Sequence, residues 1–170
     1  MKYFDKIDST NREAKRNEYE PWTILVAKEQ TSGHGKGEES WFSPKGGLYF
    51  SIILPKSNFD DLQTLTILAA FIVAKNIKEE FNLEPLIKLP NDVLVNRKKV
   101  CGILTENIIG EQLKLSVIGI GLNTNIKSFP QELENIATSL QIEAKKEINN
   151  DDVLNKIVLD LKKQFKSIII

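Results

Sequence analysis

The second half of the sequence consists of short apolar segments separated by polar turns, and this arrangement limits the fold more than any other feature. Beyond Pro85, segments with the composition of β-strands cover residues 86–88, 93–95, 100–105 and 113–122. The last three are separated by residues 96–99 and 109–111, which have the length and composition of hairpin turns. This pattern predicts an antiparallel meander of short strands.

Helical periodicity is present in three other segments. Between residues 60 and 81, apolar side chains recur at intervals of three and four, which predicts one long amphipathic helix. The same spacing over residues 151–165 predicts a second helix. A third helix is expected over residues 9–19, because Thr10 and Glu13 have the spacing of a capping box.

Two further strands are expected over residues 23–28 and 48–54. Between them lies a polar, glycine-bearing connection, residues 29–47, which is too long for a simple turn and is typical of a functional or disordered segment. The sequence therefore predicts an α+β fold, in which a mixed, largely antiparallel sheet packs against helices on one side.

Length and charge limit the domain organisation and the partners. A chain of 170 residues with 41% hydrophobic content can bury one core, so we expect a single domain over residues 1–170. The 23 basic and 23 acidic residues cancel, which argues against a nucleic-acid partner. No apolar run approaches the ~20 residues of a membrane span, and the first residues lack a signal-type run, so we expect a cytoplasmic protein without membrane association.

The segment from Gln30 to Gly37 places three alternate glycines beside His34 and Lys36. Glycine allows backbone N–H groups to approach phosphate oxygens closely, and Lys36 is able to neutralise their charge. The segment matches neither the P-loop nor the dinucleotide-binding fingerprint. Ordinary flexible loops are also often rich in glycine, and that alternative stays open at this point.

Three polar residues of the meander are further candidates for a site. Asp92 follows Asn91 beside a predicted strand, and one carboxylate together with substrate phosphates is a set of ligands that Mg²⁺ prefers. A plain Pro-Asn-Asp turn is the alternative. Lys99 begins an apolar strand in which Gly102 permits close approach of another group, although lysines also protect strand edges.

Six segments, in this order along the chain, resemble the motifs of biotin protein ligases. They are residues 8–11 (DSTN), 30–35 (QTSGHG), 41–51 (WFSPKGGLYFS), 88–93 (KLPNDV), 99–106 (KVCGILTE) and 119–125 (GIGLNTN). The resemblance extends from about residue 5 to about residue 140. It implies the catalytic-domain fold of biotin and lipoate protein ligases.

The resemblance also implies an activity. An enzyme of this family activates biotin with ATP to biotinyl-5′-AMP and transfers the biotin to a lysine of a biotin carboxyl carrier protein. Biotin and ATP are then the substrates and Mg²⁺ the cofactor, and a homodimer is compatible with the resemblance. The chain is expected to lack both the N-terminal DNA-binding domain and the small C-terminal β-barrel of longer members.

The resemblance implies a role for each of the following residues. Biotin is expected to contact Ser9, Thr10, Asn11, Gln30, Gly33, His34, Lys99 and Gly102. ATP and the adenylate are expected to contact Gly35, Lys36, Trp41, Lys88, Asn91, Asp92 and Asn123. Lys99 and Asp92 are the expected catalytic residues, Lys99 facing the biotin carboxylate and the α-phosphate and Asp92 holding Mg²⁺.

Residues 33–41, called the glycine segment below, depart from the family pattern. His34, Lys36 and Glu39 stand where members usually carry arginine, and Glu38 replaces a glycine. Arginine offers two parallel donors to an anion, whereas lysine offers a single charge and glutamate repels phosphate. These changes predict an enzyme that retains the adenylate less tightly.

Two other functions stay open at the level of the sequence. A lipoate- or octanoate-handling enzyme would have the same fold, although such enzymes are not expected to combine the Ser9-Thr10-Asn11 segment with Gln30-Thr31. A module that binds biotin or biotinyl-AMP without catalysis is the second alternative, because the arginines of the glycine segment are missing.

Overall fold

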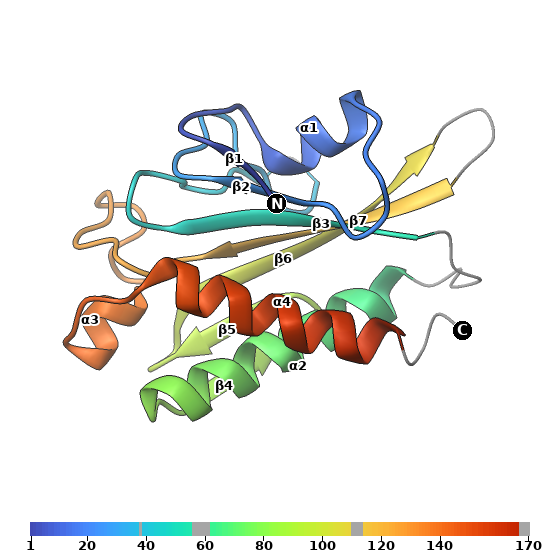
Figure 1. Cartoon of the computed structure of the whole chain (residues 1–170). Coiled ribbons are helices and arrows are strands. Elements are labelled where there is room, and N and C mark those ends of the chain that lie inside the picture. Colours follow the sequence, from blue (N-terminus) through green and yellow to red (C-terminus); the bar gives the residue numbers. More distant parts are fainter. Residues whose placement is uncertain (38, 56–61, 110–113, 167–170) are drawn as a thin grey trace.

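The computed structural model describes residues 1–37, 39–55, 62–109 and 114–166. Its strands are β1 (Lys2–Phe4), β2 (Ile24–Ala27), β3 (Leu48–Leu54), β4 (Pro85–Lys88), β5 (Asp92–Val95), β6 (Lys98–Ile109) and β7 (Lys114–Leu122). Its helices are α1 (Thr10–Arg16), α2 (Leu62–Phe81), α3 (Leu140–Ala144) and α4 (Asn150–Lys166). The strands form one twisted sheet, and the two long helices run side by side across one of its faces (Figure 1).

The strands lie in the order β1-β2-β3-β7-β6-β5-β4. Only β1 and β2 are parallel among these neighbours, so the sheet is mixed and largely antiparallel, as predicted. Strands β4 to β7 pair consecutively, which confirms the meander. At the turn between β5 and β6, Asn96 and Arg97 have φ angles of 51° and 66°, the left-handed backbone that a two-residue hairpin loop requires. The turn predicted at residues 109–111 lies mostly outside the described residues.

The predicted placement of all helices on one side of the sheet is wrong for α1. Ile24 and Val26 of β2 belong to the main core, which includes apolar side chains of α2 and α4. Leu25, whose side chain alternates with theirs, packs instead against Ala14 of α1. Figure 1 shows α1 on the face opposite α2 and α4. β2 lies inside the sheet and is apolar on both faces, so both faces must be packed against other elements. Helix α1 packs against the face of β2 that α2 and α4 leave uncovered.

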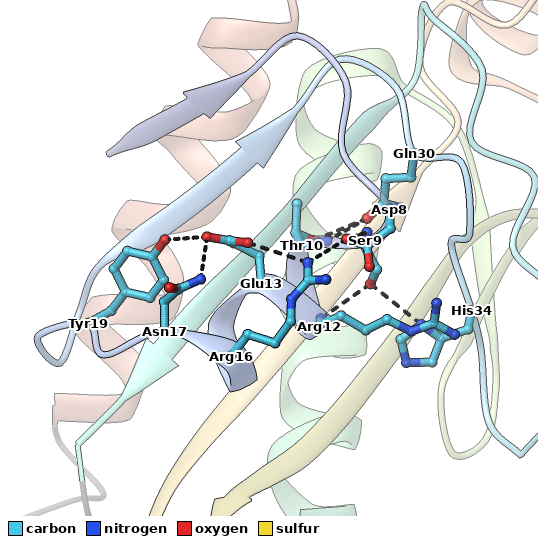
Figure 2. Close-up of polar contacts among 10 residues, drawn as sticks. All are labelled: Asp8, Ser9, Thr10, Arg12, Glu13, Arg16, Asn17, Tyr19, Gln30 and His34. Carbon is cyan, nitrogen blue, oxygen red and sulfur yellow. Dashed lines mark hydrogen bonds and ion pairs between the residues drawn. The ribbon is translucent and has the colours of Figure 1, made fainter.

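The structure corrects the predicted capping of α1, although its start beside Ser9 agrees with the expectation. Ser9, and not Thr10, is the N-cap, because the Ser9 hydroxyl accepts a hydrogen bond from the backbone N–H of Arg12. The Thr10 side chain points inward and is buried. Glu13 therefore closes no capping box; its carboxylate accepts hydrogen bonds from Asn17 and Tyr19 instead (Figure 2). The short elements β1 and α3 were not predicted.

Two observations complete the description of the fold. Cys101 is fully buried among apolar side chains, and this burial raises the pKa of its thiol, as expected for a residue of the core. Within the described ranges, the helices are all too short or too polar to cross a lipid bilayer.

Two leucines of α4 provide a matched test of the core. Leu161 is completely buried, whereas Leu159 is 67% exposed on the same helix. We expect Leu161→Ala to lower the free energy of unfolding by about 2–5 kcal/mol, because it leaves a cavity beneath the sheet. Leu159→Ala should change it by less than about 0.5 kcal/mol. Urea denaturation of both variants measures the difference, and equal losses would contradict the packing described here.

Candidate functional site

A narrow cavity of about 60 Å³ opens on the face of the sheet that carries α1. Its walls come from the first turn of α1, from the connection between β2 and β3, and from strands β6 and β7. They include Ser9, Thr10, Asn11, Gln30, His34, Gly35, Glu39, Trp41, Asn91, Lys99, Gly102, Gly119 and Gly121. Segments that are far apart in the sequence therefore meet here, because β3, β7 and β6 are neighbours in the sheet.

One end of the cavity is built from the start of α1. The Thr10 and Asn11 side chains point toward the sheet, where the Ser51 hydroxyl of β3 lies 2.7 Å from the Thr10 hydroxyl and 2.6 Å from Asn11 Oδ1. All three residues are buried. The Asn11 amide nitrogen donates to the backbone carbonyl of Leu104 at 3.2 Å and to Glu106 Oε2 at 2.9 Å. This end of the cavity is polar, ordered and shielded from solvent.

Gln30 joins this helix start to the long connection. Its Oε1 accepts from the Thr10 backbone N–H at 2.9 Å (Figure 2). Its Nε2 donates to Ser43 Oγ at 3.0 Å. His34 lies beside Ser9, with Nδ1 3.4 Å from the Ser9 hydroxyl. A local antiparallel bridge between His34 and Ser40 turns the glycine segment back on itself.

The middle of the cavity lies over backbone that carries no side chains. A Cβ atom on Gly119 would overlap the Asn11 amide, and one on Gly121 would overlap the Trp41 indole. At Gly102, a Cβ would lie 3.0 Å from the same indole. Glycine at these positions allows polar and aromatic groups to rest directly on the sheet.

Trp41 separates the two ends of the cavity. The Lys99 ammonium lies 5.1 Å from the centre of its ring, within the range of a cation–π interaction. The indole N–H is buried and has no hydrogen-bond partner among the described residues. A buried unpaired donor is costly, and a bound acceptor would remove that cost.

Lys99 and Asp92 form an ion pair next to this indole. The Lys99 nitrogen lies 2.7 Å from Asp92 Oδ1, yet the pair is not aligned as a hydrogen bond, and Oδ1 accepts none from the described residues. The charges attract at 2.7 Å whatever the direction of the N–H bonds. Asp92 is thus held beside Asn91 by the charge of Lys99.

The side chains beside the cavity fit a mode of Mg²⁺ binding in which the protein supplies one carboxylate. Among the described residues there is no group of three or more His, Cys, Asp or Glu side chains that could hold a metal ion. One carboxylate, Asp92, beside the cavity-lining residues Asn91 and Lys99 suits an ion that takes its other ligands from phosphates and water.

The structure brings ten of the predicted site residues together along this one cavity. They are Ser9, Thr10, Asn11, Gln30, His34, Gly35, Trp41, Asn91, Lys99 and Gly102. Five others lie outside its walls: Gly33, Lys36, Lys88, Asp92 and Asn123. Their contacts with ligands, like those of the first ten, stay predictions.

The residues outside the walls have different surroundings. Gly33 is buried behind Trp41 and Ser43, which leave no room for a Cβ atom. Lys36 and Lys88 are exposed. Asn123 is buried and donates to the Thr138 backbone carbonyl at 3.0 Å.

Several residues of the site were missed at the level of the sequence. Gly119, Gly121, Ser51 and Glu106 belong to the motifs named above but were given no role. The alternation of glycines in the Gly119-Ile120-Gly121 segment was an available signal, because it leaves one face of a strand without side chains. For Ser51, the available signal was a small hydroxyl side chain in an otherwise apolar strand, at the end of the motif over residues 41–51.

The contact of Trp41 with bare backbone is testable. We expect Gly121→Ala to displace the indole toward solvent and to increase its quenching by acrylamide, measured in a Trp22→Phe background. Gly35→Ala is the control, because there the added methyl group meets its nearest atom at an ordinary 3.5 Å. Unchanged quenching of Trp41 in the Gly121 variant would show that the indole does not rest on β7.

Known proteins share both the sequence pattern and the fold of this chain. Residues 3–123 match the model of the Biotin/lipoate A/B protein ligase family. The chain is 38% identical over 172 residues to the bifunctional ligase/repressor BirA of Bacillus subtilis, covering 96% of this chain and 53% of that protein. It is 32% identical over 132 residues to the biotin–[acetyl-CoA-carboxylase] ligase of Paracoccus denitrificans, covering 74% of this chain and 54% of that protein.

A solved structure agrees with these matches. The biotin protein ligase of Aquifex aeolicus, determined in complex with biotin and ATP, superposes with a TM-score of 0.90 at 32% identity, covering 98% of this chain and 70% of that one. The chain spans about half the length of the curated relatives named above. Its sequence, its sheet and the segments around its cavity together show that the chain belongs to the biotin/lipoate A/B protein ligase family.

Proposed function

We propose that this chain is the catalytic domain of a biotin protein ligase, which forms biotinyl-5′-AMP from biotin and ATP and passes biotin to a lysine of an acceptor protein. One observation carries the proposal. A buried polar cluster and Lys99, which is paired with Asp92, lie along the same cavity, and Trp41 lies next to Lys99. Such a site has separate places for a polar head group and for a phosphate.

The polar end suits the ureido ring of biotin. That ring carries two N–H donors and one carbonyl acceptor, and it needs complementary groups in an otherwise closed pocket. Ser9, Asn11 and Gln30 supply hydroxyl and amide groups, and their contacts with His34, Glu106 and Ser43, respectively, hold them in place before the substrate arrives. Such preorganisation lowers the entropic cost of binding.

The other end suits the reacting groups. In the proposed reaction a carboxylate oxygen of biotin attacks the α-phosphorus of ATP, the bond to the β-phosphate oxygen breaks, and pyrophosphate leaves. Lys99 places a positive charge where negative charge accumulates, and Trp41 offers a ring face to the adenine and an unpaired N–H to an acceptor. Asp92 would hold Mg²⁺, which neutralises phosphate charge when it is bound.

The second half of the reaction needs an acceptor. The amine of a lysine attacks the carbonyl carbon of the mixed anhydride, an amide bond forms, and AMP leaves. A biotin carboxyl carrier protein is the proposed acceptor, because the similar protein of Paracoccus denitrificans is a biotin–[acetyl-CoA-carboxylase] ligase, and a cytoplasmic setting would supply both the carrier and ATP. Within the chain itself no covalent intermediate is required.

The glycine segment is the part of the site in which this chain differs from its family. Glu39 lines the rim of the cavity, where its carboxylate lies close to Gly35, and Lys36 is exposed. A negative charge at the rim repels the phosphate of the adenylate, and among the described residues none of those that line the cavity is an arginine. The adenylate should therefore escape more readily and acylate lysines of bystander proteins.

Lys99 and its neighbour Lys98 give a direct test of the proposed catalytic role. We expect Lys99→Ala to reduce biotin-dependent pyrophosphate release by at least ~100-fold, because charge stabilisation at the phosphate is lost. Lys98→Ala should retain the activity, since the Lys98 ammonium donates to the Glu134 backbone carbonyl outside the cavity. Normal release by a folded Lys99 variant would refute the assignment.

Reversing the charge at the rim tests the escape of the adenylate. We expect Glu39→Arg to lower the biotinylation of a bystander protein about two- to fivefold, a range consistent with the modest energy of an exposed ion pair. The control is Glu18→Arg, which makes the same change of charge on an exposed surface away from the cavity. Equal bystander labelling by the parent and the Glu39 variant would show that the rim charge has no effect.

A further inference from the structure

Glu106 of β6 lies where three separate parts of the site meet. Its Oε1 accepts from the Lys15 ammonium at 2.6 Å. Its Oε2 accepts from the Asn11 amide at 2.9 Å and lies 3.4 Å from His34 Nε2. Lys15 and Asn11 belong to α1 and His34 to the glycine segment, so one carboxylate connects both to the sheet.

The surroundings of Glu106 keep it ionised. Burial, which leaves its side chain 23% exposed, acts to raise the pKa of this carboxyl. The hydrogen bonds from Lys15 and Asn11, together with the charge of Lys15, outweigh that effect and hold the pKa below its usual value. Glu106 is therefore an anion near neutral pH, and its contacts are charge-assisted.

This carboxylate fixes the orientation of the Asn11 amide. The Asn11 nitrogen donates to two acceptors, Leu104 O and Glu106 Oε2, while the Asn11 oxygen faces the Ser51 hydroxyl. A flipped amide would point its oxygen at both acceptors and lose these hydrogen bonds. The polar end of the cavity therefore offers a ligand one arrangement of donors and acceptors.

The same carboxylate faces the glycine segment. The His34 ring spans the distance between Ser9 and Glu106, with one nitrogen 3.4 Å from each, and its side chain is 19% exposed. His34 also begins the local bridge to Ser40, just before Trp41. A contact that holds His34 thus restrains the segment that carries Trp41.

We propose that Glu106 is a positioning residue that sets the affinity of the biotin end of the site, by orienting Asn11 and by holding His34 of the glycine segment against β6. The inference rests on the proposed function for the identity of the ligand. Glu106 itself is outside the cavity wall, so it acts through Asn11 and His34.

A charge-removing variant and a matched control test this role. Glu106→Gln keeps the size of the side chain but removes the charge that attracts Lys15 and His34. Glu29→Gln is the control, because Glu29 is also paired with a lysine and its side chain is 24% exposed, yet it does not line the cavity. Glu106→Asp preserves the charge and should restore part of any loss.

We expect Glu106→Gln to raise the Kd for biotin about tenfold and to change the Kd for ATP less than about twofold, both measured by calorimetry. In the protein without substrates, the backbone amides of residues 33–37 and 39–41 should exchange hydrogen faster. The Glu29 variant should match the parent in both measurements.

Two results would overturn the proposal. One is an unchanged Kd for biotin with unchanged hydrogen exchange. The other is an equal loss of affinity for biotin and ATP together with a lowered Tm, which would indicate a purely structural role. The exchange measurement needs no ligand, so it tests the contact with the glycine segment even if the parent protein fails to bind biotin. Failure of the parent protein to bind biotin would instead refute the proposed function.

Discussion

Polar and aromatic side chains rest directly on bare backbone at the centre of the sheet, and the rest of the site depends on this contact. Gly119 accommodates the Asn11 amide, while Gly121 and Gly102 accommodate the Trp41 indole. A methyl group at Gly119 or Gly121 would displace the side chain above it. Because the packing is close, the lack of side chains at these three glycines determines the shape of the pocket.

The sheet order explains why a site of this kind draws on residues so far apart in the chain. Because β3 pairs with β7 and β7 pairs with β6, Ser51, Gly119 and Leu104 lie in adjacent strands under the start of α1. The helix start then closes one end of the cavity, and the connection from β2 to β3 closes its top through Gln30 and Trp41. Each side chain of the polar end is held by a neighbour from another element.

Much of the fold could be predicted because it depends on local signals. The meander follows from short apolar runs and from turns such as Asn96-Arg97, and α2 and α4 follow from helical periodicity. The position of α1 could not be predicted in this way. That position depends on the packing of Leu25 against Ala14 on the second face of the sheet. This contact exists only once the sheet has been assembled.

Much of the site could also be predicted, because its residues stand in short motifs that can be identified in the sequence. Ser9, Gln30, Trp41 and Lys99 stand in motifs that resemble those of a family, and the structure places them along one cavity. The role of Glu106 could not be derived from the sequence, because it arises from contacts between β6, α1 and the glycine segment. Long-range contacts of this kind leave no periodic trace in a sequence.

We propose that the polar end of the cavity selects biotin. Isothermal titration of the purified chain with biotin, and separately with lipoate, tests this selectivity, because both acids are able to enter a fold of this family, whereas only biotin carries the ureido ring. We expect saturable binding of biotin with a Kd at least tenfold lower than that of lipoate. Tighter binding of lipoate, or no binding of biotin at concentrations that saturate known ligases, would contradict it.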